Sequence, residues 1–317
     1  MRRAIAAMLA GAALLGCPAS GVEDCERKPN PELTSRPIEL SGAALGFTAN
    51  DELAVLVTTD AGRAVEVPSK QWLLPVTQAQ QLIGYWAAAK GVVLGDSTRL
   101  FLVTPEESKQ ILDLPDGVAG ITLSPAGLYV VQGNNVDPRV SIHLILPDLQ
   151  VSVLERGVDL NPKTVFASGT GYCVQEYVRD GGPTGTNQIR CNSRTIIQGP
   201  DNANQYYGVR ATNRHIAHYD EAGHIALRIV DGTRVSIDVP PEQSRFVAQN
   251  DSCGFLFAER DGGSTRLRYW SSQSESLVLD HQLQNVPTNA VSAESKDGIY
   301  LRSGPQILFL NAWSTSK

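Results

Sequence analysis

The residue types best suited to metal chemistry gather in one short segment, which contains His215, His218, Asp220, Glu221 and His224. A metal site needs several donors that converge on one point. The segment is instead typical of a hairpin. Side chains alternate between the two faces of a strand, so His215 and His218 point in opposite directions. If Tyr219 pairs with His224, His215 shares a face with His224 but lies about 13 Å away along the strand. We therefore predict no metal site here, and the chain suggests no cofactor.

Nucleophile motifs offer no firmer candidate. The chain contains no G-x-S-x-G elbow, no G-x-x-x-x-G-K-[ST] loop and no Rossmann loop at a strand-to-helix junction. Its S-x-x-K match, Ser314 to Lys317, lies at the C-terminus, where fraying works against a fixed catalytic geometry. The adjacent carboxylates Glu106 and Glu107 lie in an expected turn and are interpreted as solvated charge. We predict no catalytic residue, and a role without catalysis is favoured.

A repeat organises the chain, because a short turn followed by an apolar strand recurs about every forty residues. In the clearest unit, Ile121-Thr122-Leu123 leads into Ser124-Pro125-Ala126-Gly127, and an apolar strand begins at Leu128. The turns lie near Asp51, Gly91, Gly127, Gly171, Arg214, Cys253 and Gly298. The period is that of a propeller blade. The sequence therefore predicts an all-β fold, a seven-bladed β-propeller of four-stranded antiparallel blades.

The Ser-Pro-x-Gly turn before an apolar strand resembles the WD-repeat and TolB-like propeller repeats. The likeness extends from about residue 38 to residue 313. The last repeat has no fourth strand after residues 307–310, whereas residues 37–40 precede the first repeat without a partner. Pairing these two segments would close the ring with an N-terminal strand and cover an exposed sheet edge. Two β-sandwiches are the competing architecture.

Aromatic pairs open the first strand of two repeats, and two loops, residues 132–137 and 179–187, are longer than their counterparts. Aromatic rings near a central channel can stack on a sugar or peptide, and long loops on a rigid scaffold often carry recognition. The alternatives are aromatic packing between blades and tolerated loop insertions. The weak ligand-binding candidates are Tyr85, Trp86, Tyr206, Tyr207, Asn134, Asn135 and Asp137.

The N-terminus is typical of a secretory signal. Arg2 and Arg3 precede an apolar run, residues 4–15, that is too short to span a bilayer. The run ends in Leu14-Leu15-Gly16-Cys17, which resembles the cleavage box of bacterial lipoproteins. The resemblance implies cleavage before Cys17 and acylation of that cysteine, palmitate included. The alternative is a plain secretory signal with an incidental cysteine.

We therefore expect a signal peptide in residues 1–16, a lipidated cysteine and tether in residues 17–36, and the propeller in residues 37–317. The resemblance implies a protein of the cell envelope, lipid-anchored to a bacterial membrane, with its propeller in the periplasm or at the cell surface. Pro18 rather than Asp follows the acylated cysteine. In lipoproteins of the enterobacterial type this slightly favours the outer membrane.

The cysteine count fits an oxidising compartment, because four cysteines remain after Cys17. Cys173 and Cys191 flank a segment typical of a hairpin with a long turn, whose two arms would bring them within disulfide reach. Cys25 and Cys253 would then pair by elimination and attach the tether to the domain. Buried free thiols are the alternative, and the absence of a CxxC pair argues against zinc.

Composition narrows the function. The chain of 317 residues is 42% hydrophobic and 19% charged, which is ordinary for a globular protein. Its net charge of -6, with no basic cluster, argues against nucleic acid as a partner. We predict a membrane-anchored envelope lipoprotein whose non-catalytic propeller is a scaffold for protein–protein recognition, with another envelope protein as partner. The alternatives are a propeller hydrolase or lyase, or a glycan-binding module, acting at the central mouth.

Overall fold

The computed structural model describes residues 27–49, 52–124, 127–133, 139–168, 171–178, 186–191, 194–200, 207–212, 214–220, 223–239, 244–246, 253–261, 264–284, 292–295 and 297–314. Regular structure in these residues is antiparallel β-sheet, apart from a single short 3-10 helix, Pro68–Lys70. No helix in the described part of the chain is both long and apolar enough to cross a membrane.

Two four-stranded sheets come first in the chain, each made of consecutive strands joined by short turns. The first contains β2 (Ala43–Ala49), β3 (Leu53–Thr59), β4 (Gly62–Val67) and β5 (Trp72–Pro75). The second contains β6 (Gln81–Trp86), β7 (Gly91–Gly95), β8 (Arg99–Val103) and β9 (Ser108–Asp113). This strand order is a simple meander, as the repeat predicted.

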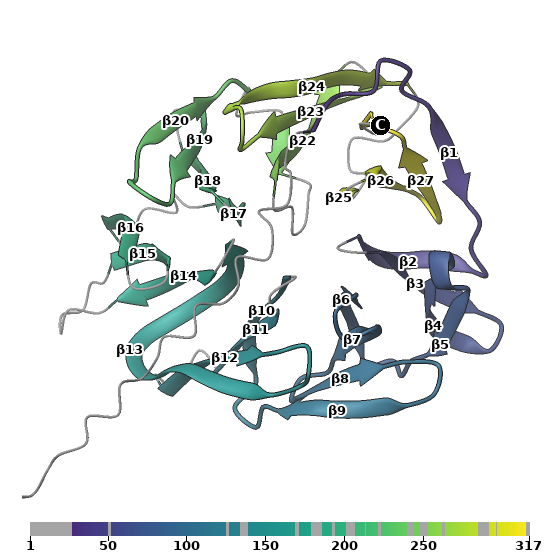
Figure 1. Cartoon of the computed structure of the whole chain (residues 1–317), viewed down its shortest axis with the longest axis horizontal. Coiled ribbons are helices and arrows are strands. Elements are labelled where there is room, and N and C mark those ends of the chain that lie inside the picture. The colour runs from purple at the N-terminus through teal and green to yellow at the C-terminus, as the bar shows by residue number, and fades with distance from the viewer. Residues whose placement is uncertain are drawn as a thin grey trace, which may run out of the picture.

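The next sheet has seven strands, because one long strand takes part in two four-stranded units. Its order is β10 (Val118–Ser124), β11 (Gly127–Gln132), β12 (Arg139–Ile145), β13 (Val151–Ser168), β14 (Gly171–Val178), β15 (Thr186–Cys191) and β16 (Arg194–Pro200). The first half of β13 pairs with β12 as far as Asp159, and its second half, from Leu160, pairs with β14. In Figure 1, β13 is the long curved strand that joins these two units.

Three further four-stranded sheets complete the described fold. They contain β17 (Tyr207–Ala211), β18 (His215–Asp220), β19 (Gly223–Arg228) and β20 (Arg234–Ile237), then β21 (Ser244–Phe246), β22 (Gly254–Asp261), β23 (Ser264–Ser271) and β24 (Ser276–Leu283), then β25 (Ser292–Ser295), β26 (Gly298–Ser303), β27 (Gln306–Leu310) and β1 (Ser35–Ile38). The sheets stand around a common centre, each beside the next (Figure 1).

The strand β1 joins the two ends of the chain in one sheet. It pairs antiparallel with β27, and Pro37 lies opposite Leu308. This is the predicted pairing, although β1 begins at Ser35 rather than at Pro37. Within the expected tether, the backbone N–H of Asn30 also donates to the carbonyl of Ala312 (2.8 Å). The N-terminal segment is therefore attached to the C-terminal residues before β1 begins.

The core lies between neighbouring sheets, so most central strands are covered on both faces. Five consecutive residues of β3 are buried, and Ala54, Val55 and Val57 have 0% exposure. A fully buried Val contributes about 1.5–3 kcal/mol through removal of its surface from water. Two-sided cover explains why these strands are continuous apolar runs rather than alternating ones.

Glycine begins several second strands because the backbone there lies against a neighbouring strand. A Cβ atom on Gly254 would lie 2.2 Å from the carbonyl oxygen of Trp270, and one on Gly298 would lie 2.0 Å from that of Leu310. No side chain fits at these distances. The recurring glycine turns of the sequence are therefore a packing requirement of the repeat.

Candidate functional site

The two loops expected to carry recognition leave neighbouring four-stranded units. One connects β11 to β12 and the other connects β14 to β15, and each joins the second and third strands of its unit. Rotation about the common centre therefore places both connections on the same rim of the ring (Figure 1). The candidate residues Asn134, Asn135 and Asp137 lie outside the described residues, as do residues 179–185. The strands that carry these loops are described, and three polar or covalent contacts lie on them.

A polar cluster lies at the base of the β11–β12 loop. His143 Nε2 lies 3.0 Å from Gln132 Oε1 and 2.8 Å from Ser141 Oγ. The Gln132 amide nitrogen donates to Asp116 Oδ2 at 3.4 Å. The Gln132 oxygen therefore faces the imidazole, and this network assigns the proton to His143 Nε2.

This assignment limits the chemistry of the cluster. A serine becomes a nucleophile when a neighbouring base accepts its proton. Here the nitrogen nearest Ser141 donates, and the Ser141 hydroxyl lies 3.3 Å from Gln132 Oε1, to which it donates. His143 is also only 9% exposed. The cluster is suited to holding the loop base in a fixed shape and not to activating Ser141.

An ion pair joins the first half of β13, which pairs with β12, to the next unit. Arg190 on β15 binds Glu155 through its two terminal guanidinium nitrogens, with Nη1–Oε1 and Nη2–Oε2 distances of 2.9 and 2.8 Å. The Tyr172 hydroxyl on β14 also donates to Glu155. Burial raises the pKa of Glu155, but the hydrogen bonds from Arg190 and Tyr172 outweigh it and leave the pKa below its usual value. The carboxylate is therefore ionised at neutral pH.

Burial raises the pKa of Tyr172, and its hydrogen bond to Glu155 raises that pKa further. The phenol stays protonated and donates. Its ring also lies 5.5 Å from the ring of Tyr129 on β11. Tyr172 therefore contacts side chains from both units that share β13 and joins the two units, at the end of β14 away from the second loop.

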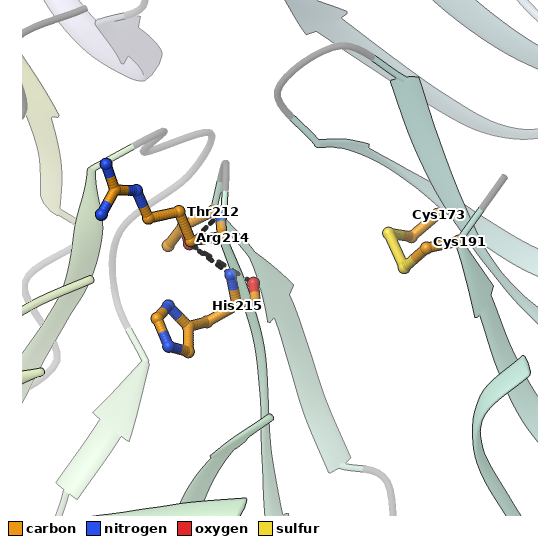
Figure 2. The surroundings of a disulfide bond; sticks show 5 residues. All are labelled: Cys173, Cys191, Thr212, Arg214 and His215. Atoms are coloured by element: carbon orange, nitrogen blue, oxygen red, sulfur yellow. Dashed lines mark hydrogen bonds between the residues drawn. A yellow bond between two sulfur atoms is a disulfide. The ribbon is translucent and has the colours of Figure 1, made fainter. Parts of the chain in front are cut away.

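A disulfide fastens the strands that carry the second loop. Cys173 and Cys191 lie directly opposite each other on β14 and β15, as predicted, and both are buried. The two cysteines belong to a buried cluster with Ile216 of β18, and Figure 2 shows the disulfide together with His215, the first residue of that strand. Cys253 is also disulfide-bonded. Its predicted partner Cys25 lies outside the described residues, as does the lipidation candidate Cys17.

The histidine segment forms the expected hairpin, with Tyr219 opposite His224. His215 is 1% exposed, and its Nε2 lies 2.9 Å from Glu275 Oε1 in the turn before β24. Arg228 binds the same carboxylate through two nitrogens. Within the described residues, no group of three or more His, Cys, Asp or Glu side chains is placed to hold a metal ion.

The aromatic candidates that the structure describes are packing residues. Trp86 is 0% exposed and belongs to a buried cluster with Leu128 and Ile145 of the next unit. Tyr85 is 5% exposed, and its ring lies 6.0 Å from that of Trp72. Neither ring presents a face for stacking on a ligand, so the interblade alternative describes them. Tyr207 lies at the start of β17, and Tyr206 lies outside the described residues.

Several side chains in this region had no sequence signal. Glu155, Tyr172 and Arg190 are spread over three strands, and no spacing rule links them. The nearest signal for the β12 pair is the i, i+2 spacing of Ser141 and His143, which places both on one face of a strand. That pattern is too common to identify a site.

Comparison with known proteins shows the fold alone. No protein-family model and no curated protein matches the chain. Among solved structures, the β-propeller domain of the Trilobed protease from Pyrococcus furiosus is similar, with a TM-score of 0.53 at 10% identity over 88% of this chain and 95% of that one. The chain therefore folds as a β-propeller.

Two other structures are similar at the same level. A chain of the mitotic checkpoint complex has a TM-score of 0.53 at 13% identity, covering 100% of both chains. A chain of the hydrazine synthase from Kuenenia stuttgartiensis has a TM-score of 0.50 at 11% identity, covering 89% of this chain and 98% of that one. The neighbours are a domain of a protease, a chain of a synthase and a chain of a checkpoint complex, so the fold does not assign an activity.

Proposed function

We propose that this chain is a lipid-anchored envelope lipoprotein whose seven-bladed propeller binds a protein partner without catalysis. The partner docks on one rim, through the loops at residues 132–139 and 179–187. The observation that carries this proposal is the fixed scaffold that carries those loops. The Gln132–His143 cluster lies at the base of the first loop. The Glu155–Arg190 pair and the Cys173–Cys191 disulfide fasten the strands that carry the second loop, at the ends of β14 and β15 away from it.

Rigid anchors matter because binding costs conformational entropy. A loop whose end is already fixed, as at Gln132, loses less freedom when a partner orders it. The two loops lie on one rim and can engage a single partner together. This combination is more useful for recognition than for turnover, because the described polar groups at the loop bases bind each other and no base is placed to activate Ser141.

The seven-bladed ring is part of the same proposal. Dividing the seven-stranded sheet at β13 makes two units, and β1 completes the sheet that contains β25 to β27. The four-stranded sheets and these two units then form seven blades. The pairing of β1 with β27 closes the ring by joining the first strand to the last blade.

The anchor is proposed from the Leu14-Leu15-Gly16-Cys17 box and rests on sequence alone. Metabolic labelling with a palmitate analogue tests it. We expect label in the membrane fraction of the wild type and none in Cys17→Ser. A labelled Cys17→Ser protein would place the acyl chain elsewhere.

In-cell photocrosslinking tests the recognition surface. A photoreactive residue is placed at Asn135 or at Gly182, with Glu106 as the matched control. Glu106 lies in the turn between the third and fourth strands of its unit, which belongs to the opposite rim. We expect one abundant envelope protein to be linked from Asn135 and Gly182 and not from Glu106. Equal yields from both rims, or no linked protein, would contradict the proposal.

A further inference from the structure

An exposed apolar edge runs along the start of β13, in the half that pairs with β12. Val151, Val153 and Leu154 are 43%, 38% and 39% exposed, and Ser152 between them is also exposed. On one side these residues pair with β12, with Val151 opposite Ile145 and Val153 opposite His143. No other strand in the described part of the fold pairs with their second side. We call residues 151–154 the β13 edge.

The β13 edge lacks the protection that the other outer strands carry. Exposed sheet edges in natural proteins are usually blunted by charged residues or proline, which discourage pairing with another chain. Among the outer strands whose side chains are described, the protective residues are Arg36 and Pro37 on β1, Pro75 on β5, Lys109 on β9, Arg234 on β20 and Asp280 on β24. The β13 edge contains none, and the next residue, Glu155, is held by Arg190 and Tyr172.

We propose that the β13 edge is the surface through which two copies of this chain associate, by antiparallel pairing about a two-fold axis at Ser152. A two-fold contact needs a surface that is complementary to itself. The segment Val151-Ser152-Val153 reads the same in both directions. Centring it on the axis places Val151 opposite the partner's Val153 on each side, with the two Ser152 residues facing each other.

The length of the paired segment is limited on both sides. Asp148 lies in the turn that precedes β13, where the N–H of Leu146 donates to the carbonyl of Gln150. The register shift opposite Ile142 and His143 leaves Leu154 as an extra residue, which confines the pairing to residues 151–153.

This dimer would not depend on the loops of the proposed recognition surface, because the β13 edge lies on the outermost strand of its unit and not on the rim. We expect a weak dimer, since the contact involves one short strand from each copy and little buried area. A weak self-association requires tests that report both equilibrium and geometry.

Sedimentation velocity over a concentration series measures the equilibrium. The protein is the full chain carrying Cys17→Ser, which removes the acylation site and leaves the four cysteines expected in disulfides. We expect concentration-dependent dimers, and Val153→Lys should weaken dimerisation about tenfold because two symmetry-related apolar pairs are lost. The matched control is Leu73→Lys, at a residue 47% exposed on the outer strand β5, which should leave dimerisation unchanged. Equal melting temperatures for the two variants exclude a folding defect.

Cysteine crosslinking measures the geometry. Directly opposite residues of antiparallel strands have Cα atoms about 4.5–5.5 Å apart, which is within the range of a disulfide. Ser152→Cys should therefore give a dimer under mild oxidation that a reductant releases. Ser108→Cys, at the start of β9, should remain monomeric. The proposal is overturned if the wild type is monomeric at every concentration, if both cysteine variants crosslink equally, or if the β13 edge instead captures an extended segment of another protein.

Discussion

Glu275 holds His215 across the boundary between two sheets, with Nε2 of His215 2.9 Å from Oε1 of Glu275. Sixty positions separate them in sequence. The His215 ring also meets the ring of Trp270 edge-on, with centroids 5.1 Å apart. Because Arg228 of β19 binds the same carboxylate, one side chain in a turn fastens two strands of the neighbouring unit.

This contact makes stability depend on pH. The hydrogen bond from Arg228, with help from His215, lowers the pKa of Glu275 to about 2, against 4.5 for the free side chain. Its stabilisation is therefore complete above about pH 5 and is lost as pH falls towards 2. Burial lowers the pKa of His215 below 6.5. As pH falls below 6.5, His215 is therefore protonated in the unfolded chain before it is protonated in the folded one. This also lowers the stability of the folded state as pH falls.

Melting curves of Glu275→Gln test this dependence. We expect the variant to melt below the wild type at pH 7, and the difference between the two melting temperatures to shrink as pH falls from 5 to 2. The control is Glu106→Gln, at an exposed turn residue, which should match the wild type throughout. A difference that stayed constant over this range would show that Glu275 contributes through packing rather than charge.

Removing the disulfide should loosen the strands below the second loop. Cys173→Ala with Cys191→Ala is expected to lower the free energy of unfolding by about 3 kcal/mol, because the unfolded chain regains the freedom of the closed loop. Urea unfolding measures this change. Reduced wild type should unfold at or below the midpoint of the double variant, because reduction also opens the disulfide of Cys253. An unchanged midpoint for the double variant would show that the Cys173–Cys191 bond does not affect stability.

Trp86→Ala should act on stability and not on ligand binding. Truncation of a fully buried tryptophan costs about 3–5 kcal/mol through lost burial and the cavity left behind, so the melting temperature should fall by roughly 10 °C. The control is Leu73→Ala, at a residue 47% exposed, for which little change is expected. A stable Trp86→Ala protein that had lost affinity for a glycan would revive the stacking hypothesis.

Deleting residues 37–41 should destabilise the whole domain. The deletion removes Pro37 and Ile38 from β1, whose partners on β27 are Leu308 and Ile307, and it exposes the edge of that sheet. We expect the melting temperature to fall by more than about 10 °C, measured by circular dichroism. An unchanged melting curve would mean that β1 does not contribute to the cooperative unit.

The repeat, the strand order within units and the Cys173–Cys191 pairing could be predicted because each depends on residues close in sequence. Turn residues and apolar runs mark a four-stranded meander locally, and the β18–β19 hairpin follows from its own turn. The pairing of β1 with β27 was predictable for another reason, since an incomplete last repeat and an unpaired first strand imply each other.

The contacts around the candidate site could not be predicted in this way. Glu275 reaches His215, and Arg190 reaches Glu155, only after neighbouring units have packed, so no local pattern links them. The burial of both Tyr85 and Trp86, which was left open as the alternative to ligand binding, could not be decided from the sequence for a related reason. Alternation along a strand implies one covered face, whereas a sheet that stands between two others is covered on both.

The pairing of Ser35 with Leu310 has a consequence for the order of events in folding. Synthesis proceeds from the N-terminus, so β1 is the first strand made, yet its partner β27 is almost the last. Every other sheet can assemble from strands that follow one another within a few dozen residues. The final sheet needs strands from both ends of the described chain, and long-range pairing of this kind is intrinsically slow. Until the two strands meet, β1 has no partner and β27 has one unpaired edge, and unpaired edges favour association with other chains.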